Sequence, residues 1–270
     1  MDADISYSEQ KFSLDDDNLQ EELFRLGEKQ KKLLNVPISF SVYDDFVSGV
    51  IGKREEIVAF AKGLIIQLAS MYSYDEVKFV FVYDKKESND FDFVKWLPHT
   101  WSNDGKFRFI ATDINECKEV SSYLDRVIDS KNDRQGSEVK NSDDYYVIFS
   151  LDRTLGLRVD AINKVLESKE NINFSVINFY DELKDLPKEC SRVIELRGKE
   201  SSIFDKNDIS GHVIKFDNDI SLNRDANVLA KRLSNIYLDS QNSNFKLPDM
   251  ITFMNLFGVG KVEHLNAPTR

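Results

Sequence analysis

Residues 46–55 (FVSGVIGKRE) contain the glycines and the lysine of this chain that come closest to a phosphate-binding turn. Such a turn joins a strand to a helix: its glycines let backbone N–H groups surround the phosphates, its lysine reaches the β- and γ-phosphate oxygens, and a Ser or Thr hydroxyl holds Mg²⁺. Gly49, Gly52 and Lys53 supply part of that set. Arg54 and Glu55 stand where the hydroxyl is expected, and GxxxxGK[ST] occurs nowhere in the sequence. Two interpretations stay open here: a reduced nucleotide site, or a glycine turn before a helix.

A second requirement for nucleotide hydrolysis is an apolar strand that ends in two acidic residues, which hold Mg²⁺ and position the attacking water. Residues 145–149 (YYVIF) have the character of such a strand, but Ser150 and Leu151 follow it. Asp152 is displaced by two positions and is equally suited to cap a helix. Asp84 follows another apolar strand. Hydrolysis is therefore not expected, and no cofactor is required. If the turn does hold ATP, Lys53 and Arg54 are the candidate phosphate contacts and Asp84 and Asp152 the candidate Mg²⁺ partners.

Other patterns of catalytic or metal-binding residues are missing from the sequence. The three histidines lie in unrelated contexts without HExxH, no serine lies in GxSxG, and no GxGxxG occurs. Cys117 and Cys190 are too few and too far apart for a zinc knuckle or a disulfide framework. We expect two idle thiols in a reducing compartment.

The composition is that of a globular protein, with 41 % hydrophobic and 31 % charged residues among 270. Lys and Arg total 36 against 47 Asp and Glu, a formal charge of −11 that disfavours nucleic-acid binding. The apolar runs are too short to cross a bilayer and no signal peptide precedes them, so the sequence predicts a soluble cytoplasmic chain.

Apolar stretches alternate with amphipathic ones along the chain. Extended segments are expected at residues 38–42, 46–51, 77–83, 107–111, 145–149, 174–179, 192–196 and 212–216, and helices at residues 18–34, after 52, from 113, at 161–166 and at 224–238. This alternation predicts an α/β fold with a mainly parallel sheet and helices on both faces, of the Rossmann-like kind. In such sheets ligands bind at the carboxyl ends of the strands.

Several stretches together resemble the EssC, YukB and EccC proteins, the FtsK/SpoIIIE-type ATPases of type VII protein secretion. The most specific are residues 95–101 (KWLPHTW) and 257–266 (FGVGKVEHLN). Supporting stretches are the turn at Gly52 with residues 64–69, then residues 108–112, 186–190 and 245–253. The resemblance covers most of the chain from about residue 38 onward.

The resemblance implies a degenerate P-loop-ATPase-like domain that precedes the first motif-bearing ATPase domain of such a protein. Residues 1–36 would then be a linker or stalk helix, residues 37–240 the ATPase-like domain without Walker motifs, and residues 241–270 the connection to the next domain. The implied role is non-hydrolysing coupling or regulation at the cytoplasmic face of the membrane. Its implied partners are the adjacent ATPase domains of the same chain and the membrane components of the secretion system. A regulatory nucleotide-binding domain and a docking module for secretion partners are the alternatives.

Overall fold

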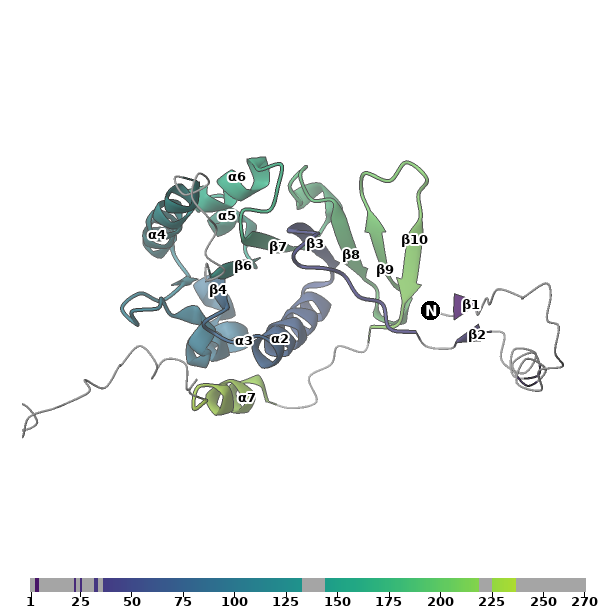
Figure 1. Ribbon diagram of the computed structural model, residues 1–270, viewed down its shortest axis with the longest axis horizontal. Helices are drawn as coiled ribbons and strands as arrows, with labels where there is room; N and C mark the ends of the chain where they lie inside the picture. The colour runs from purple at the N-terminus through teal and green to yellow at the C-terminus, as the bar shows by residue number, and fades with distance from the viewer. Residues whose placement is uncertain are drawn as a thin grey trace, which may run out of the picture. The chain divides into compact units, whose positions relative to one another are not determined.

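The computed structural model describes residues 36–132, 144–218 and 225–236, together with residues 3–4, 22, 25 and 32–33. Its centre is a sheet of eight strands in the order β10-β9-β8-β3-β7-β6-β4-β5 (Figure 1). The strands are β3 (Val47–Gly52), β4 (Val77–Val82), β5 (Ile110–Ala111), β6 (Tyr145–Ser150), β7 (Phe174–Tyr180), β8 (Arg192–Leu196), β9 (Ser201–Asp205) and β10 (Val213–Phe216). Two further short strands, β1 (Ala3–Asp4) and β2 (Lys32–Leu33), pair with each other.

The six strands from β8 to β5 are all parallel, whereas β9 and β10 extend the sheet in antiparallel pairing. Every residue of β4 and β7 is buried, which is expected for parallel strands that are covered on both faces. The first strand of this sheet in sequence, β3, lies in its middle, between β7 and β8. The carboxyl ends of β3, β6, β7 and β8 therefore share one edge.

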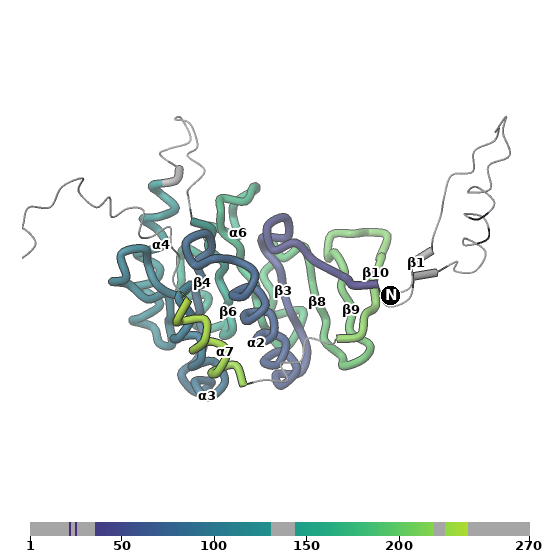
Figure 2. Tube along the Cα trace, turned by 60° about the horizontal axis from the view of Figure 1, so that its bottom comes forward, coloured from purple at the N-terminus to yellow at the C-terminus, as the bar shows by residue number. Residues whose placement is uncertain are grey.

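Helices cover the two faces of the sheet (Figures 1 and 2). On one face lie α2 (Arg54–Met71), α7 (Ala226–Leu233), α3 (Ser88–Phe91) and the 3₁₀ segment η2 (Asp92–Trp96); on the other lie α4 (Ile114–Asn132), α5 (Arg153–Gly156) and α6 (Asp160–Glu167). Two apolar cores result, one on each side of the sheet. The first includes a stacked pair of rings, Phe81 and Phe149, with centroids 4.9 Å apart.

Short 3₁₀ segments connect the larger elements. They are η1 (Lys85–Glu87), η3 (Pro98–Thr100), η4 (Leu183–Asp185) and η5 (Gly198–Glu200). Cys117 and Cys190 are both buried and free. Within the described residues, the structure has no helix that is both long enough and apolar enough to cross a membrane.

The structure confirms the predicted α/β class with its mainly parallel sheet and its two helical layers. Four local expectations differ. Residues 38–42 form no strand; Ile38, Phe40 and Val42 instead pack beside the sheet. The strand expected at residues 107–111 is reduced to Ile110–Ala111, and β9 was not expected. Of the helix predicted at residues 18–34, the structure describes residues 22 and 25 as helical, but residues 32–33 form the strand β2 and not a helix end. The connection predicted at residues 241–270 lies outside the described residues.

Candidate functional site

The predicted phosphate turn lies at the carboxyl edge of the sheet and is very short. β3 ends at Gly52 and α2 begins at Arg54, so Lys53 alone connects them. Lys53 has extended backbone angles, accepts the N–H of Ile57 on its carbonyl at 3.0 Å and keeps its side chain exposed. A phosphate-binding loop needs several consecutive backbone N–H groups that curve around the anion. One connecting residue cannot supply that curve.

The two glycines of the turn are explained by packing. Gly52 has a φ of +151°, and a Cβ at this position would lie 2.8 Å from the carbonyl oxygen of Leu196 in β8. At Gly49 a Cβ would overlap the side-chain methyl groups of Leu186. Both glycines thus permit a close approach of neighbouring protein atoms.

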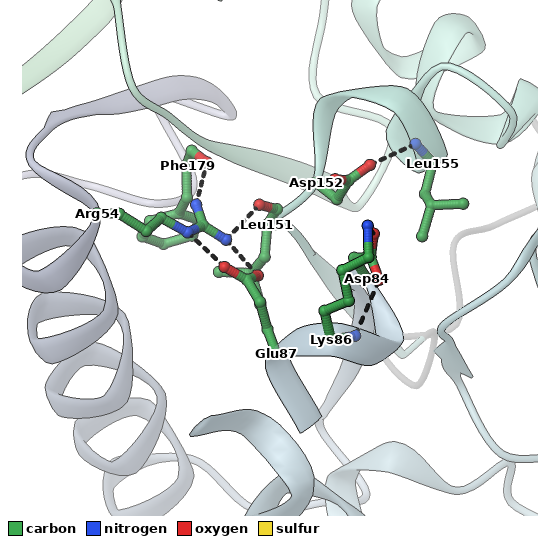
Figure 3. Close-up of polar contacts among 8 residues, drawn as sticks. All are labelled: Arg54, Asp84, Lys86, Glu87, Leu151, Asp152, Leu155 and Phe179. Atoms are coloured by element: carbon green, nitrogen blue, oxygen red, sulfur yellow. Dashed lines mark hydrogen bonds and ion pairs between the residues drawn. The ribbon is translucent and has the colours of Figure 1, made fainter. Parts of the chain in front are cut away.

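Arg54 is directed into the edge, across the ends of β6 and β7 (Figure 3). Its Nε donates to Oε1 of Glu87 at 2.6 Å, and its Nη2 also donates to Oε2 of the same carboxylate. Nη2 donates further to the carbonyl of Leu151 at 2.8 Å, and Nη1 donates to the carbonyl of Phe179 at 3.2 Å. The guanidinium group that was a candidate phosphate contact is thus bound by protein oxygens.

Both candidate Mg²⁺ partners cap helical turns at this edge (Figure 3). The Asp152 carboxylate accepts the N–H of Leu155 at 2.8 Å and is the N-cap of α5. The Asp84 carboxylate accepts the N–H of Lys86 at 2.9 Å and is the N-cap of η1. Of the two roles that the sequence left open for Asp152, the geometry shows the capping role. Among the described residues, no group of three or more His, Cys, Asp or Glu side chains is arranged to hold a metal ion.

The end of β6, where hydrolysis requires acidic residues, is occupied by a neutral hydrogen bond. Ser150 is fully buried, and its Oγ lies 2.8 Å from the phenol oxygen of Tyr180 at the end of β7. Burial is the main cause that raises the pKa of Tyr180 to about 12, so the phenol stays protonated. Gly156 packs directly against this hydrogen-bonded pair: a Cβ at position 156 would lie 2.5 Å from Ser150 Oγ, so a larger residue would not fit.

A cavity of about 700 Å³ lies beside Lys53, between the start of α2 and the ends of β7 and β8. Its charged lining consists of two cations, Lys53 and Arg197, and four carboxylates, Glu56, Asp181, Glu182 and Glu195. Arg197 already donates to Glu195, with Nε 2.9 Å from Oε1. The lining therefore carries a net negative charge, which disfavours a polyphosphate.

The structure brings Gly52, Lys53, Arg54, Asp84 and Asp152 to one edge, while Gly49 lies within β3. It does not direct Lys53 and Arg54 at a common point, because Lys53 faces the cavity and Arg54 crosses β6 and β7. Sequence reasoning missed Glu87, the partner of Arg54. Glu87 lies in a charged run (DKKE) just after β4, and no pattern in that run distinguishes it from a solvated glutamate.

The sheet and its two helical layers define the class: an α/β domain with a mainly parallel sheet covered by helices on both faces. No protein-family model matches the chain. A solved structure of EssC (ATPases 2 and 3) from Geobacillus thermodenitrificans superposes with a TM-score of 0.56 at 11 % identity, covering 88 % of this chain and 52 % of that structure.

Sequence comparison leads to the same group of proteins. The type VII secretion system protein EssC of Staphylococcus aureus (strain NCTC 8325 / PS 47) is 21 % identical over 273 residues, covering 98 % of this chain and 18 % of EssC. The ESX secretion system protein EccC of Geobacillus thermodenitrificans is 22 % identical over 255 residues, covering 92 % of this chain and 17 % of EccC. The chain is a distant homologue of the type VII secretion ATPases EssC and EccC, and it spans less than a fifth of their length.

Proposed function

We propose that this chain is a non-hydrolysing coupling domain of a type VII secretion ATPase. The observation that carries the proposal is the connection between β3 and α2, which consists of Lys53 alone and leaves no loop for phosphates. The end of β6 supports it, because Ser150 and Leu151 occupy the positions where hydrolysis requires acids. A domain of this kind would keep the packing of a motor domain while its chemistry is carried out elsewhere.

In this proposal the domain precedes the first motif-bearing ATPase domain of its parent and lies at the cytoplasmic face of the membrane. It would transmit conformational change between the membrane components of the secretion system and the adjacent ATPase domains of the same chain. Distant homology to EssC along nearly the whole of the present chain supports a place within a parent protein of this kind.

The direct test is calorimetric titration of the purified chain with ATP and ADP, with and without Mg²⁺, alongside melting curves. A ligand that binds only the folded state raises its apparent stability, so the two measurements check each other. We expect neither heat of binding nor a melting shift at millimolar nucleotide, and no phosphate release. A substantial ATPase rate that Lys53→Ala abolishes would overturn the proposal.

A regulatory nucleotide site is the second candidate, favoured by the cavity in which Gly52 and Lys53 lie side by side. The same titration decides it. Micromolar binding that is weakened by Lys53→Ala, but not by Lys106→Ala on an exposed loop, would establish this reading. The excess of carboxylates in the cavity argues against it.

A further inference from the structure

Four oxygen atoms from three separate segments surround the guanidinium group of Arg54. Glu87 in η1 contributes both carboxylate oxygens, Leu151 contributes its carbonyl just after β6, and Phe179 contributes its carbonyl within β7 (Figure 3). Arg54 itself opens α2. A single side chain therefore joins the start of a helix, the ends of two central strands and the segment that follows β4.

The arrangement suits a guanidinium group in particular. Its planar fork can donate to a carboxylate with two parallel hydrogen bonds and still direct N–H groups at neighbouring carbonyls. The side chains of Arg54 and Glu87 are only 31 % and 24 % exposed, so solvent screens this pair less than a pair at the open surface. Without the cation, a carboxylate and two carbonyl oxygens would converge with no donor between them.

A second ion pair joins the same two regions but touches no strand. Lys62 Nζ, two turns further along α2, lies 2.6 Å from Oδ1 of Asp90 in α3. A cavity of about 450 Å³, with Val58 and Ala59 in its lining, lies between the two pairs. The chain thus provides its own matched control: both pairs connect α2 to the segment after β4, but the Arg54 pair alone of these two reaches the ends of β6 and β7.

We propose that Arg54 is an internal latch. It supplies from the protein itself the cation that holds residues 84–91 against the ends of β6 and β7, so the carboxyl edge stays closed without nucleotide or metal. This rests on the proposed function, since a coupling domain that binds no nucleotide needs another means of keeping its motor-like edge rigid. If the carboxyl edge of the sheet stays rigid in this way, the domain would transmit a conformational change as one body.

Hydrogen exchange followed by mass spectrometry tests the latch on the full chain. Two reporters are the N–H of Glu87, bonded to the Asp84 carbonyl at 2.8 Å, and the N–H of Leu151, bonded to the Val82 carbonyl at 2.8 Å. We expect Arg54→Ala to speed exchange in peptides that cover residues 84–91 and 151–155 by about tenfold or more, because it removes several charge-assisted hydrogen bonds. Lys62→Ala should change exchange there by less than about twofold, since it removes a single ion pair with a carboxylate that is 48 % exposed and reaches neither strand end. Arg54→Lys should fall between them, because an ammonium group lacks the fork.

Equal exchange in the Arg54→Ala and Lys62→Ala variants would overturn the latch. If Arg54→Ala does not fold, Glu87→Gln compared with Asp90→Asn decides by the same rule: faster exchange in Glu87→Gln alone supports the latch, and equal exchange overturns it. Calorimetric titration with Mg-ATP separates the two proposals. Nucleotide binding would overturn the coupling-domain function. The latch is judged separately, by hydrogen exchange in the Arg54 and Lys62 variants or in the Glu87 and Asp90 variants.

Discussion

At the scale of single residues, Gly52 is the position where the backbone requires glycine most directly. Its φ of +151° is unfavourable for any residue with a Cβ, and that Cβ would meet the carbonyl oxygen of Leu196, which β-sheet pairing holds in place. Neither cause involves a ligand. Gly52 is therefore required by the close packing of β3 against β8.

We therefore expect Gly52→Ala to lower the free energy of unfolding by about 3 kcal/mol, measured by urea denaturation. Gly105→Ala is the control: its φ is +66° but no atom lies within 4 Å of the added Cβ, so backbone strain alone should cost about 1 kcal/mol. Equal losses in the two variants would show that contact with Leu196 contributes nothing.

His99 is a buried histidine that the fold holds in its neutral form. Its Nε2 lies 2.9 Å from the carbonyl of Tyr72, its ring stacks on Phe79 with centroids 4.6 Å apart, and its Nδ1 is buried without a hydrogen-bond partner. Burial lowers the pKa of His99 below its ordinary value of 6.5; the Tyr72 carbonyl opposes this and Lys78 adds to it. Packing, and not a ligand, explains this residue.

A lowered pKa in the folded state means that the unfolded chain binds the proton more tightly. The contribution of His99 to stability is complete above pH 6.5 and is lost as the pH falls through the folded value. We expect His99→Gln to flatten the decline in urea midpoint between pH 7 and pH 5, measured against the wild type over the same range. An unchanged decline in the His99→Gln variant would show that His99 does not contribute to the pH dependence of stability.

The candidate site could be predicted from sequence only in outline. The strand-to-helix turn and the missing acids after residues 145–149 were readable because each is local in the chain. The ring of oxygens around Arg54 was not, because Glu87, Leu151 and Phe179 lie 33, 97 and 125 residues away from it. Nor could spacing show that Gly49 faces Leu186.

At the scale of elements, α5 begins at a cap that was also a candidate Mg²⁺ ligand. Asn accepts the same N–H hydrogen bond as Asp at an N-cap, but it is a poor substitute for a carboxylate that holds Mg²⁺. We expect Asp152→Ala to lose about 1 kcal/mol of stability and Asp152→Asn to lose only a few tenths. Melting curves with and without millimolar Mg²⁺ check both. A stabilisation by Mg²⁺ that is lost in Asp152→Asn would restore the metal interpretation.

Apolar strands were the elements easiest to predict, and short or polar ones the hardest. β4 (VKFVFV) and β7 (FSVINFY) are mostly apolar and fully buried runs between turn residues, so their pattern indicates a strand. β9 begins with two serines and is defined by its pairing with β8 and β10, which local sequence does not reveal. Ile38, Phe40 and Val42 alternate like a strand but only pack against the core.

At the scale of the whole molecule, the formal charge of −11 governs which partners can bind. Binding to a phosphate backbone releases counterions only where Lys and Arg gather, and here acids outnumber bases. Fluorescence anisotropy with a labelled 20-nucleotide duplex should show no binding at about 0.15 M salt. Saturable binding at that salt would require a local basic surface that the charge balance hides.

The order of the strands has a consequence for how the chain is made on the ribosome. β3 is the first strand of the sheet to be synthesised, but Ser48 contacts Asn178, 130 residues later. At about 5–20 residues per second, β3 waits on the order of ten seconds before either neighbour exists. During that interval an apolar strand has two open edges, a recognised risk for aggregation. Efficient synthesis of this domain is therefore expected to depend on whatever shields residues 47–52 until β7 emerges.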